Sequence, residues 1–278
     1  MTTVPLALLV FRGGCPVTQA YLEYLSLHGM QPELIMAIDY VGETRRSQDL
    51  RRVLGLRASA RLLRTWRNRS ARVPAELANI LQKEFSIKLT PGCEPDYESA
   101  APNVLYLTVN SYSDPRLLTA MRDCGLNTFL YCSGGRVPAS LFQAGFSILH
   151  VHPGVVPHIR GSDGLLWSLL VRGRPGVSCF YMDAGIDTGR LIDTIEYQAP
   201  NWPGLDVEPA ILYHALLQCY DPHLRASLLA TVLKERLPIN NNINELDAKG
   251  QMDVESGHYY AMHPELRLRV LSKLCAPG

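Results

Sequence analysis

Three of the eight histidines lie within nine positions, in the stretch Ile148-Leu-His-Val-His-Pro-Gly-Val-Val-Pro-His-Ile-Arg-Gly161. The first two, His150 and His152, follow a short apolar run and precede a Pro-Gly pair. Side chains two positions apart on a β-strand point to the same face. We therefore predict that both imidazoles project from the end of one strand and form part of a functional site. His158 is interpreted as a loop histidine with local partners.

The segments that must position this stretch alternate between strand and helix patterns. Apolar runs of strand length occupy residues 5–11, 34–40, 104–109, 128–132, 177–182 and 191–197, with a shorter one at 85–89. Helical spacing occurs at residues 16–28, 115–124, 164–171, about 207–235 and 263–274. This alternation predicts an α/β fold with a mostly parallel sheet flanked by helices. Ligands of such sheets bind beyond the carboxyl ends of the strands, where the loops at 133–138 and 153–161 fall.

Composition sets limits on compartment and partners. The formal net charge of +1 favours no class of partner. The longest apolar runs are too short to span a bilayer, and no basic segment precedes an apolar one at the start, so we expect neither a membrane span nor a signal peptide. The seven cysteines are scattered and include no Cys-x-x-Cys pair, which predicts reduced thiols and a cytoplasmic location.

An arginine-rich segment at residues 45–72 has the spacing of an amphipathic helix. Its only acidic neighbours are Glu43 and Asp49. Two interpretations stay open. The simpler one is a solvated helix whose long arginine stems cover apolar surface. The other is a basic face for a phosphate-bearing or acidic partner, such as a nucleotide-linked substrate or a carrier protein. RNA is less favoured, because no nucleic-acid motif accompanies the segment.

Several landmarks agree in order and spacing with one enzyme family. They are His150-Val-His-Pro-Gly-Val-Val-Pro-His-Ile-Arg-Gly161, Leu166-Trp-Ser168, Gly176-Val-Ser178 and Ile186-Asp-Thr-Gly189, preceded by Gly135-Arg-Val-Pro138. This pattern resembles the folate-dependent formyltransferases, which include methionyl-tRNA formyltransferase and the sugar and amino-acid N-formyltransferases. The resemblance covers roughly residues 4–200. It implies a Rossmann-like fold and transfer of a formyl group from 10-formyltetrahydrofolate to an amine.

The resemblance also assigns catalytic positions. His152 and Asp187 match the family's catalytic His and Asp, whereas His150 stands where the family has Asn. Attack of an amine on the formyl carbon builds an oxyanion, and one hydrogen-bond donor aimed at it is worth about 2.7–4 kcal/mol. His152 would supply such a donor. Asp187 would raise the pKa of His152 and relay a proton. Because two adjacent imidazoliums repel, we expect at most one of His150 and His152 to be charged.

Further positions are expected to contact the substrate or the folate. By their place in the pattern these are Asn110, Gly135, Val137, Gly154 and Arg160. Gly154 stands where the family usually has Ser. For Arg160, holding the loop and contacting the substrate are both open.

The histidine in place of Asn supports a second hypothesis. If the family fold holds, His150, His152 and Asp187 converge, and two imidazoles with one carboxylate are a plausible ligand set for iron or zinc. Such a site leaves coordination positions for water or substrate and would serve a hydrolase or an oxygen-using enzyme. A third hypothesis is a binding protein that kept the fold and lost the chemistry.

The end of the chain bears on the substrate. We predict a catalytic domain over residues 1–203 and a small, mainly helical extension over residues 204–278. Methionyl-tRNA formyltransferase carries a β-barrel after its catalytic domain, and the extension lacks barrel-like strand alternation. A small amine, possibly nucleotide-linked or bound to a carrier protein, is therefore favoured over tRNA. The extension would complete a pocket or form a homodimer interface.

Overall fold

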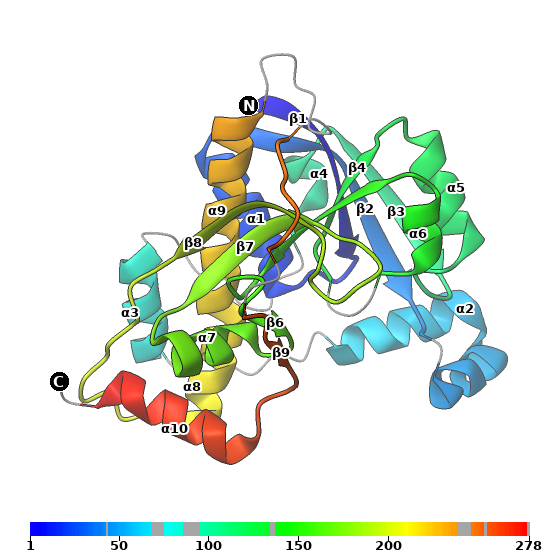
Figure 1. Cartoon of the computed structure of the whole chain (residues 1–278). Coiled ribbons are helices and arrows are strands. Elements are labelled where there is room, and N and C mark those ends of the chain that lie inside the picture. Colours follow the sequence, from blue (N-terminus) through cyan, green and yellow to red (C-terminus); the bar gives the residue numbers. More distant parts are fainter. Residues whose placement is uncertain are drawn as a thin grey trace. The chain divides into compact units, whose positions relative to one another are not determined.

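A computed structural model describes residues 1–42, 44–67, 75–85, 95–133, 137–237, 246–252 and 255–276 (Figure 1). The chain divides into two compact units. The first comprises Met1–Ser70, Gly92–Leu149 and Leu237–Leu246, and the second comprises Ala71–Pro91, His150–Arg236 and Asp247–Gly278. This division differs from the boundary expected after residue 203, which stays a prediction.

One seven-stranded sheet contains all the predicted strands except the one at 85–89. Its members are β1 (Thr2–Phe11), β2 (Met30–Tyr40), β3 (Asn103–Val109), β4 (Thr128–Tyr131), β5 (Ser147–His152), β7 (Gly176–Tyr181) and β8 (Arg190–Glu196), in the order β3-β2-β1-β4-β5-β7-β8. The pairs β1–β2, β1–β4, β2–β3 and β4–β5 are parallel, whereas β7 and β8 are antiparallel. The predicted α/β class with a mostly parallel sheet and flanking helices is confirmed.

The first unit contains five of the described helices, and the sequence explains how two of them begin. They are α1 (Pro16–Leu27), α2 (Arg45–Arg67), α4 (Tyr97–Ala100), α5 (Pro115–Asp123) and α6 (Ala139–Gln143). Proline is the first residue of both α1 and α5, where its missing N–H costs no hydrogen bond. Asp114 caps α5 by accepting from the backbone N–H of Arg116.

Helix α2 confirms the predicted helix in the arginine-rich segment as far as Arg67; residues 68–72 lie outside the described residues. A break at Gly55, whose φ is +75°, divides it into two helical pieces. Among the side chains described, Arg45, Arg46, Arg52, Arg57 and Arg61 are exposed, and so are Val53, Leu54 and Leu62. Both interpretations of this basic segment therefore stay predictions.

The second unit contains the last two strands of the sheet and most of the remaining helices. Its other elements are α3 (Ala75–Phe85), α7 (Gly164–Arg172), α8 (Pro209–Ala215), a π-helical turn η1 (Leu216–Tyr220), α9 (Asp221–Arg236), α10 (Pro264–Cys275) and a small sheet of β6 (Arg160–Gly161) with β9 (His258–Tyr259). The helix predicted over about 207–235 is thus three consecutive helical segments. Of the strand predicted at 85–89, Phe85 is the last residue of α3, and residues 86–89 lie outside the described part.

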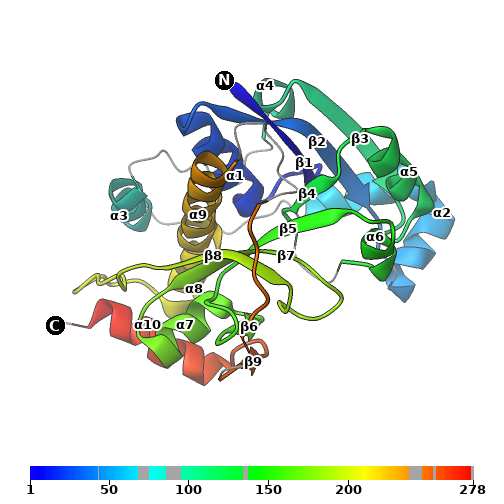
Figure 2. The ribbon, with the colours of Figure 1, turned by 45° about the horizontal axis from the view of Figure 1, so that its top comes forward.

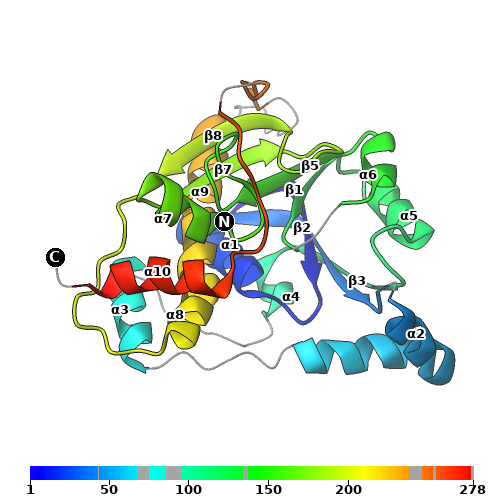
Figure 3. The ribbon, with the colours of Figure 1, turned by 60° about the horizontal axis from the view of Figure 1, so that its bottom comes forward.

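Packing in the second unit follows the apolar faces of these helices. Helix α9 packs against β7 and β8, which run side by side (Figure 2), and buries Leu224, Leu228 and Leu229. Helix α10 packs against α7 and α8 (Figure 3). A search of the described helices for one long and apolar enough to cross a bilayer finds none. The six cysteines that the structure describes form no disulfide.

Candidate functional site

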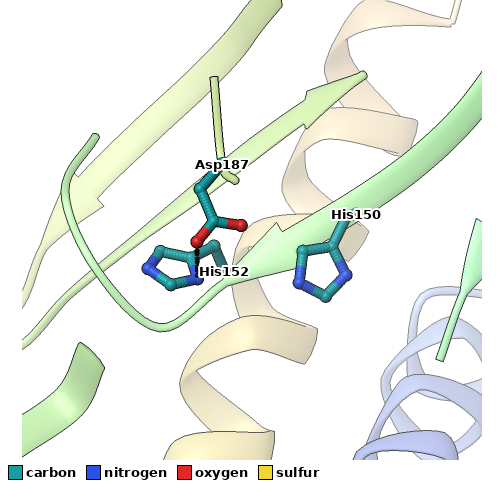
Figure 4. A group of neighbouring side chains, drawn as sticks. All are labelled: His150, His152 and Asp187. Atoms are coloured by element: carbon teal, nitrogen blue, oxygen red, sulfur yellow. Dashed lines mark ion pairs between the residues drawn. The ribbon is translucent and has the colours of Figure 1, made fainter. Parts of the chain in front are cut away.

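The two histidines of interest lie at the end of β5, as predicted, and both belong to the second unit. His152 is buried, whereas His150 is half-buried and packs edge-on against the Phe180 ring, with ring centroids 5.8 Å apart. The centroids of the two imidazoles are 6.5 Å apart. Figure 4 shows the carboxylate of Asp187 approaching the His152 ring, with His150 beside them.

Each ring nitrogen of His152 lies near an oxygen that only accepts hydrogen bonds. Nε2 lies 3.1 Å from the backbone oxygen of Ile159. A carbonyl oxygen only accepts, so Nε2 carries a hydrogen and donates it. The other nitrogen, Nδ1, lies 3.5 Å from Oδ2 of Asp187. A neutral ring that makes this hydrogen bond has its unprotonated Nδ1 beside the carboxylate, whereas a protonated ring donates to both oxygens.

Close packing around this ring requires glycine at two positions. A Cβ at Gly154 would lie 2.7 Å from the Ile159 oxygen and 2.9 Å from Nε2 of His152. A Cβ at Gly164 would lie 2.2 Å from the backbone oxygen of Pro153. A serine at position 154, which is usual in the formyltransferases that the sequence resembles, would thus collide with the Ile159 oxygen and the His152 ring. The geometry gives Gly154 a packing role, and its contact with a ligand stays a prediction.

Asp187 reaches the site from the loop between β7 and β8. Its φ of +53° lies in the left-handed region, which an aspartate adopts rarely. Oδ2 accepts a hydrogen bond of 2.8 Å from the backbone N–H of Gly161. Asp183, at the start of the loop, accepts from the N–H of Gly185 and the hydroxyl of Thr188. Asp183 is therefore a turn residue, whereas Asp187 faces the histidines.

Burial lowers the pKa of His152 below its ordinary value. Asp187 and the hydrogen bond to Ile159 act in the opposite direction, while the Arg225 guanidinium also lowers the pKa. The expected effect of Asp187 is thus present, but burial outweighs it. The lowered pKa favours the neutral form of the ring.

The other predicted site residues are divided between the two units. Arg160 donates from Nε and Nη2 to Oε1 of Gln251, at 3.1 and 2.6 Å. Asn110 and Val137 belong to the first unit, where Asn110 accepts from Arg51 and Val137 is buried. Gly135 lies outside the described residues. His158, which donates to the backbone oxygen of Glu255, has the local partner expected of a loop histidine.

Two residues of the site were not found from the sequence. Arg225, on α9, donates from Nε to the backbone oxygen of Val151 at 2.7 Å, directly between the two histidines, and forms an ion pair with Asp221. Gln251 donates from Nε2 to the backbone oxygens of Asp187 and Gly189. Both residues follow the segments that resemble the formyltransferases. No local motif marks either one.

One group of side chains has the spacing of metal ligands. One ligand atom from each of His150, His152 and Asp187 lies within 4.8 Å of the other two, and this is the only such group of three in the part of the chain that is described. The structure therefore brings together the three residues on which both chemical hypotheses depend.

Comparison with known proteins yields only distant structural likeness. No protein-family model matches the chain, and no curated protein is similar to it in sequence. A sugar N-formyltransferase from a Shewanella species is 10% identical, with 99% of this chain and 88% of that chain covered and a TM-score of 0.48. A 4-N formyltransferase from Francisella tularensis is 12% identical, with 97% and 87% covered and a TM-score of 0.46. The formyltransferase PseJ from Anoxybacillus kamchatkensis, solved with a nucleotide-linked formamido sugar and tetrahydrofolate, is 16% identical, with 65% and 90% covered and a TM-score of 0.45. Likeness at this level does not show what this chain does.

Proposed function

We propose that this chain is an N-formyltransferase that moves a formyl group from 10-formyltetrahydrofolate to an amine. The observation that carries the proposal is the His152–Asp187 pair. Nδ1 of this buried imidazole lies 3.5 Å from a carboxylate that a backbone N–H holds in place. The landmarks between residues 135 and 189 support a folate formyl donor.

This geometry suits the proton transfer that formyl transfer requires. The amine nitrogen attacks the formyl carbon and forms a C–N bond, which leaves a cationic nitrogen and an oxyanion. Nδ1 of His152 accepts the proton, and the Asp187 carboxylate stabilises the imidazolium that forms. The bond from the formyl carbon to the folate nitrogen then breaks, and that nitrogen takes the proton back from Nδ1.

His152 was expected to donate a hydrogen bond to the oxyanion, and the geometry restricts how it could do so. Because the Nε2 hydrogen of His152 is committed to the Ile159 carbonyl, only protonated Nδ1 could donate to the oxyanion. His150, which stands where the related family has an amide donor, is the other candidate for this role. One such donor lowers the barrier by about 2.7–4 kcal/mol.

The proposed acceptor is a small amine, either free, nucleotide-linked or bound to a carrier protein. Among the described residues that follow β8, helices α8, α9 and α10 predominate, and the one strand is the two-residue β9. This supports a small acceptor over tRNA, because the tRNA enzyme of the related family carries a β-barrel in that region.

The direct test measures tetrahydrofolate release from 10-formyltetrahydrofolate with a panel of amino sugars, nucleotide-linked amino sugars and carrier-bound amines. We expect turnover with at least one amine and a loss of about 10²- to 10⁴-fold in kcat for His152→Ala, because general base catalysis is removed. The matched control is His158→Ala, whose kcat should stay within about threefold of the wild type because that ring serves only a loop contact. Absence of tetrahydrofolate release with every amine would contradict the proposal.

A metal-dependent reaction is the second candidate, and one observation favours it. Ligating histidines usually donate their other ring N–H to a carbonyl or carboxylate, as His152 does to Ile159. With the ligand atoms of His150 and Asp187 close by, this set could hold iron or zinc.

His150→Asn separates the two candidates, because it restores the residue usual in the formyltransferases and removes a metal ligand. Formyl transfer predicts that the variant keeps or gains turnover. A metal enzyme predicts loss of both activity and metal, measured by elemental analysis of protein purified without an affinity tag. A wild-type protein without stoichiometric metal would exclude the second candidate.

A further inference from the structure

Gln251 connects the two backbone segments that hold Asp187. Its Nε2 donates to the backbone oxygen of Asp187 at 2.9 Å and to that of Gly189 at 2.8 Å. Its Oε1 accepts both hydrogen bonds from Arg160. An amide has two donor hydrogens and two acceptor lone pairs, so all its capacity is used.

The partners determine the orientation of this amide. The two backbone oxygens only accept, and the Arg160 guanidinium only donates. Rotating the amide by 180° would place its oxygen against two carbonyls and its NH₂ group against a guanidinium. The arrangement seen is therefore the only one of the two that makes hydrogen bonds.

These contacts close a ring around the proposed catalytic carboxylate. Arg160 is adjacent to Gly161, whose N–H donates to Oδ2 of Asp187 at 2.8 Å. The backbone oxygen of Asp187 accepts from Gln251, and Gln251 in turn accepts from Arg160, which completes the ring of contacts. Because Asp187 has a left-handed φ, its own conformational preference does not hold this loop, and the ring supplies contacts that do.

The segment that carries Gln251 is itself attached to β8. Leu191 and Lys249 exchange two backbone hydrogen bonds, of 2.7 and 2.8 Å. The Gln251 side chain is half-buried, whereas the neighbouring Met252 is 73% exposed. Residues 247–252 thus form a strap on β8, from which Gln251 reaches the Asp187 loop.

We propose that Gln251 is a positioning residue, which keeps the Asp187 carboxylate at the distance from His152 that proton transfer needs. The inference rests on the proposed function, since it takes Asp187 as the partner of the proton acceptor. It assigns a part in the reaction to a segment about sixty residues after Asp187 in the sequence.

Gln251→Glu tests this with little change in shape. The carboxylate still accepts from Arg160, but it has no hydrogen to donate and its oxygens face the carbonyls of Asp187 and Gly189. We expect kcat to fall by about 10- to 100-fold, because misplacement by an ångström costs up to about 10²-fold. The KM values for donor and amine should change by less than about threefold. Met252→Ala is the matched control and should leave kcat and KM unchanged.

A second readout does not depend on turnover. The Gly161 amide donates to the Asp187 carboxylate, so its hydrogen exchange reports whether that carboxylate stays in place. In Gln251→Glu and Gln251→Met it should exchange about five- to tenfold faster, the value of about one hydrogen bond. The amides of Leu191 and Lys249 should keep their exchange rates and so show that the strap is still attached.

The outcomes separate the two proposals. Unchanged Gly161 exchange in both Gln251 variants would overturn the positioning role, whatever the activity. Faster Gly161 exchange with an unchanged kcat would overturn it as well. A wild-type protein without turnover but with the expected exchange changes would overturn the proposed function and leave Gln251 as the residue that holds Asp187.

Discussion

The second unit contains two buried histidines that differ in the groups that act on their pKa. His152 at the end of β5 is 3% exposed, and His223 in α9 is 4% exposed. Burial lowers the pKa of both, that of His223 to about 4. For His152, the Asp187 carboxylate at 3.5 Å and the Ile159 carbonyl oppose this effect.

The difference shows what distinguishes a chemical group from a packed one. A buried imidazole with a lowered pKa accepts a proton at a cost in free energy that burial imposes. A carboxylate beside Nδ1 repays part of that cost when the proton arrives, as it would from an attacking amine. The position of the carboxylate therefore identifies His152 as the catalytic candidate, and burial or a shifted pKa does not.

Replacing Asp187 with Asn should remove the charge that stabilises a protonated His152. Of the changes discussed below, it should have the largest effect on activity. Asn keeps an oxygen that can accept from the Gly161 N–H, so the loop stays in place, but it cannot stabilise an imidazolium. We expect kcat for formyl transfer to fall by about 10²- to 10³-fold. The pKa of the His152 ring should also fall further below its ordinary value, because Asp187 raises it in the wild type.

Enzyme assays together with an NMR titration of the His152 ring measure both effects. His223→Gln serves as the control for activity and should keep kcat within about threefold of the wild type. A kcat for Asp187→Asn close to the wild-type value would show that the carboxylate takes no part in the reaction.

The sequence was sufficient for the seven strands of the main sheet and for the three residues that converge. Continuous apolar runs predict strands buried on both faces, and β1, β2, β3, β4 and β5 lie where those runs are. His150, His152 and Asp187 were found because the spacing of their landmarks resembles a known family. The parallel sheet followed from the alternation of strands and helices.

Sequence patterns could not predict the residues that hold the site in place. Gln251 and Arg225 act through backbone carbonyls far away in the sequence, and a carbonyl is present at every position and leaves no motif. The break at Gly55 and the π-helical turn before α9 depend on local hydrogen bonding that the apolar periodicity does not report. The committed hydrogen on Nε2 of His152 likewise required the position of Ile159.

His223 should make the larger contribution of the two histidines to the pH dependence of the free energy of unfolding. Its pKa of about 4 in the folded chain lies below the value of 6.5 for a free histidine. Between these pH values the unfolded chain binds the proton and the folded chain does not, so stability falls as the pH falls. The stabilisation that is complete above pH 6.5 should decrease by up to about 3 kcal/mol toward pH 4.

His223→Gln removes the titrating group from this position. The wild type should lose more unfolding free energy than the variant when urea unfolding is compared at pH 7.5 and pH 4.5, by about 2–3 kcal/mol. Comparing the two pH values within each protein cancels the cost of the substitution itself. If wild type and variant lose the same amount, His223 carries no penalty of burial, and its likeness to His152 does not extend to the energetics. The expected result would instead show that burial of an imidazole has two different consequences in this unit. Burial of His223 in α9 lowers the stability of the fold at acidic pH, whereas the buried His152 at the end of β5 has a carboxylate that stabilises its protonated form.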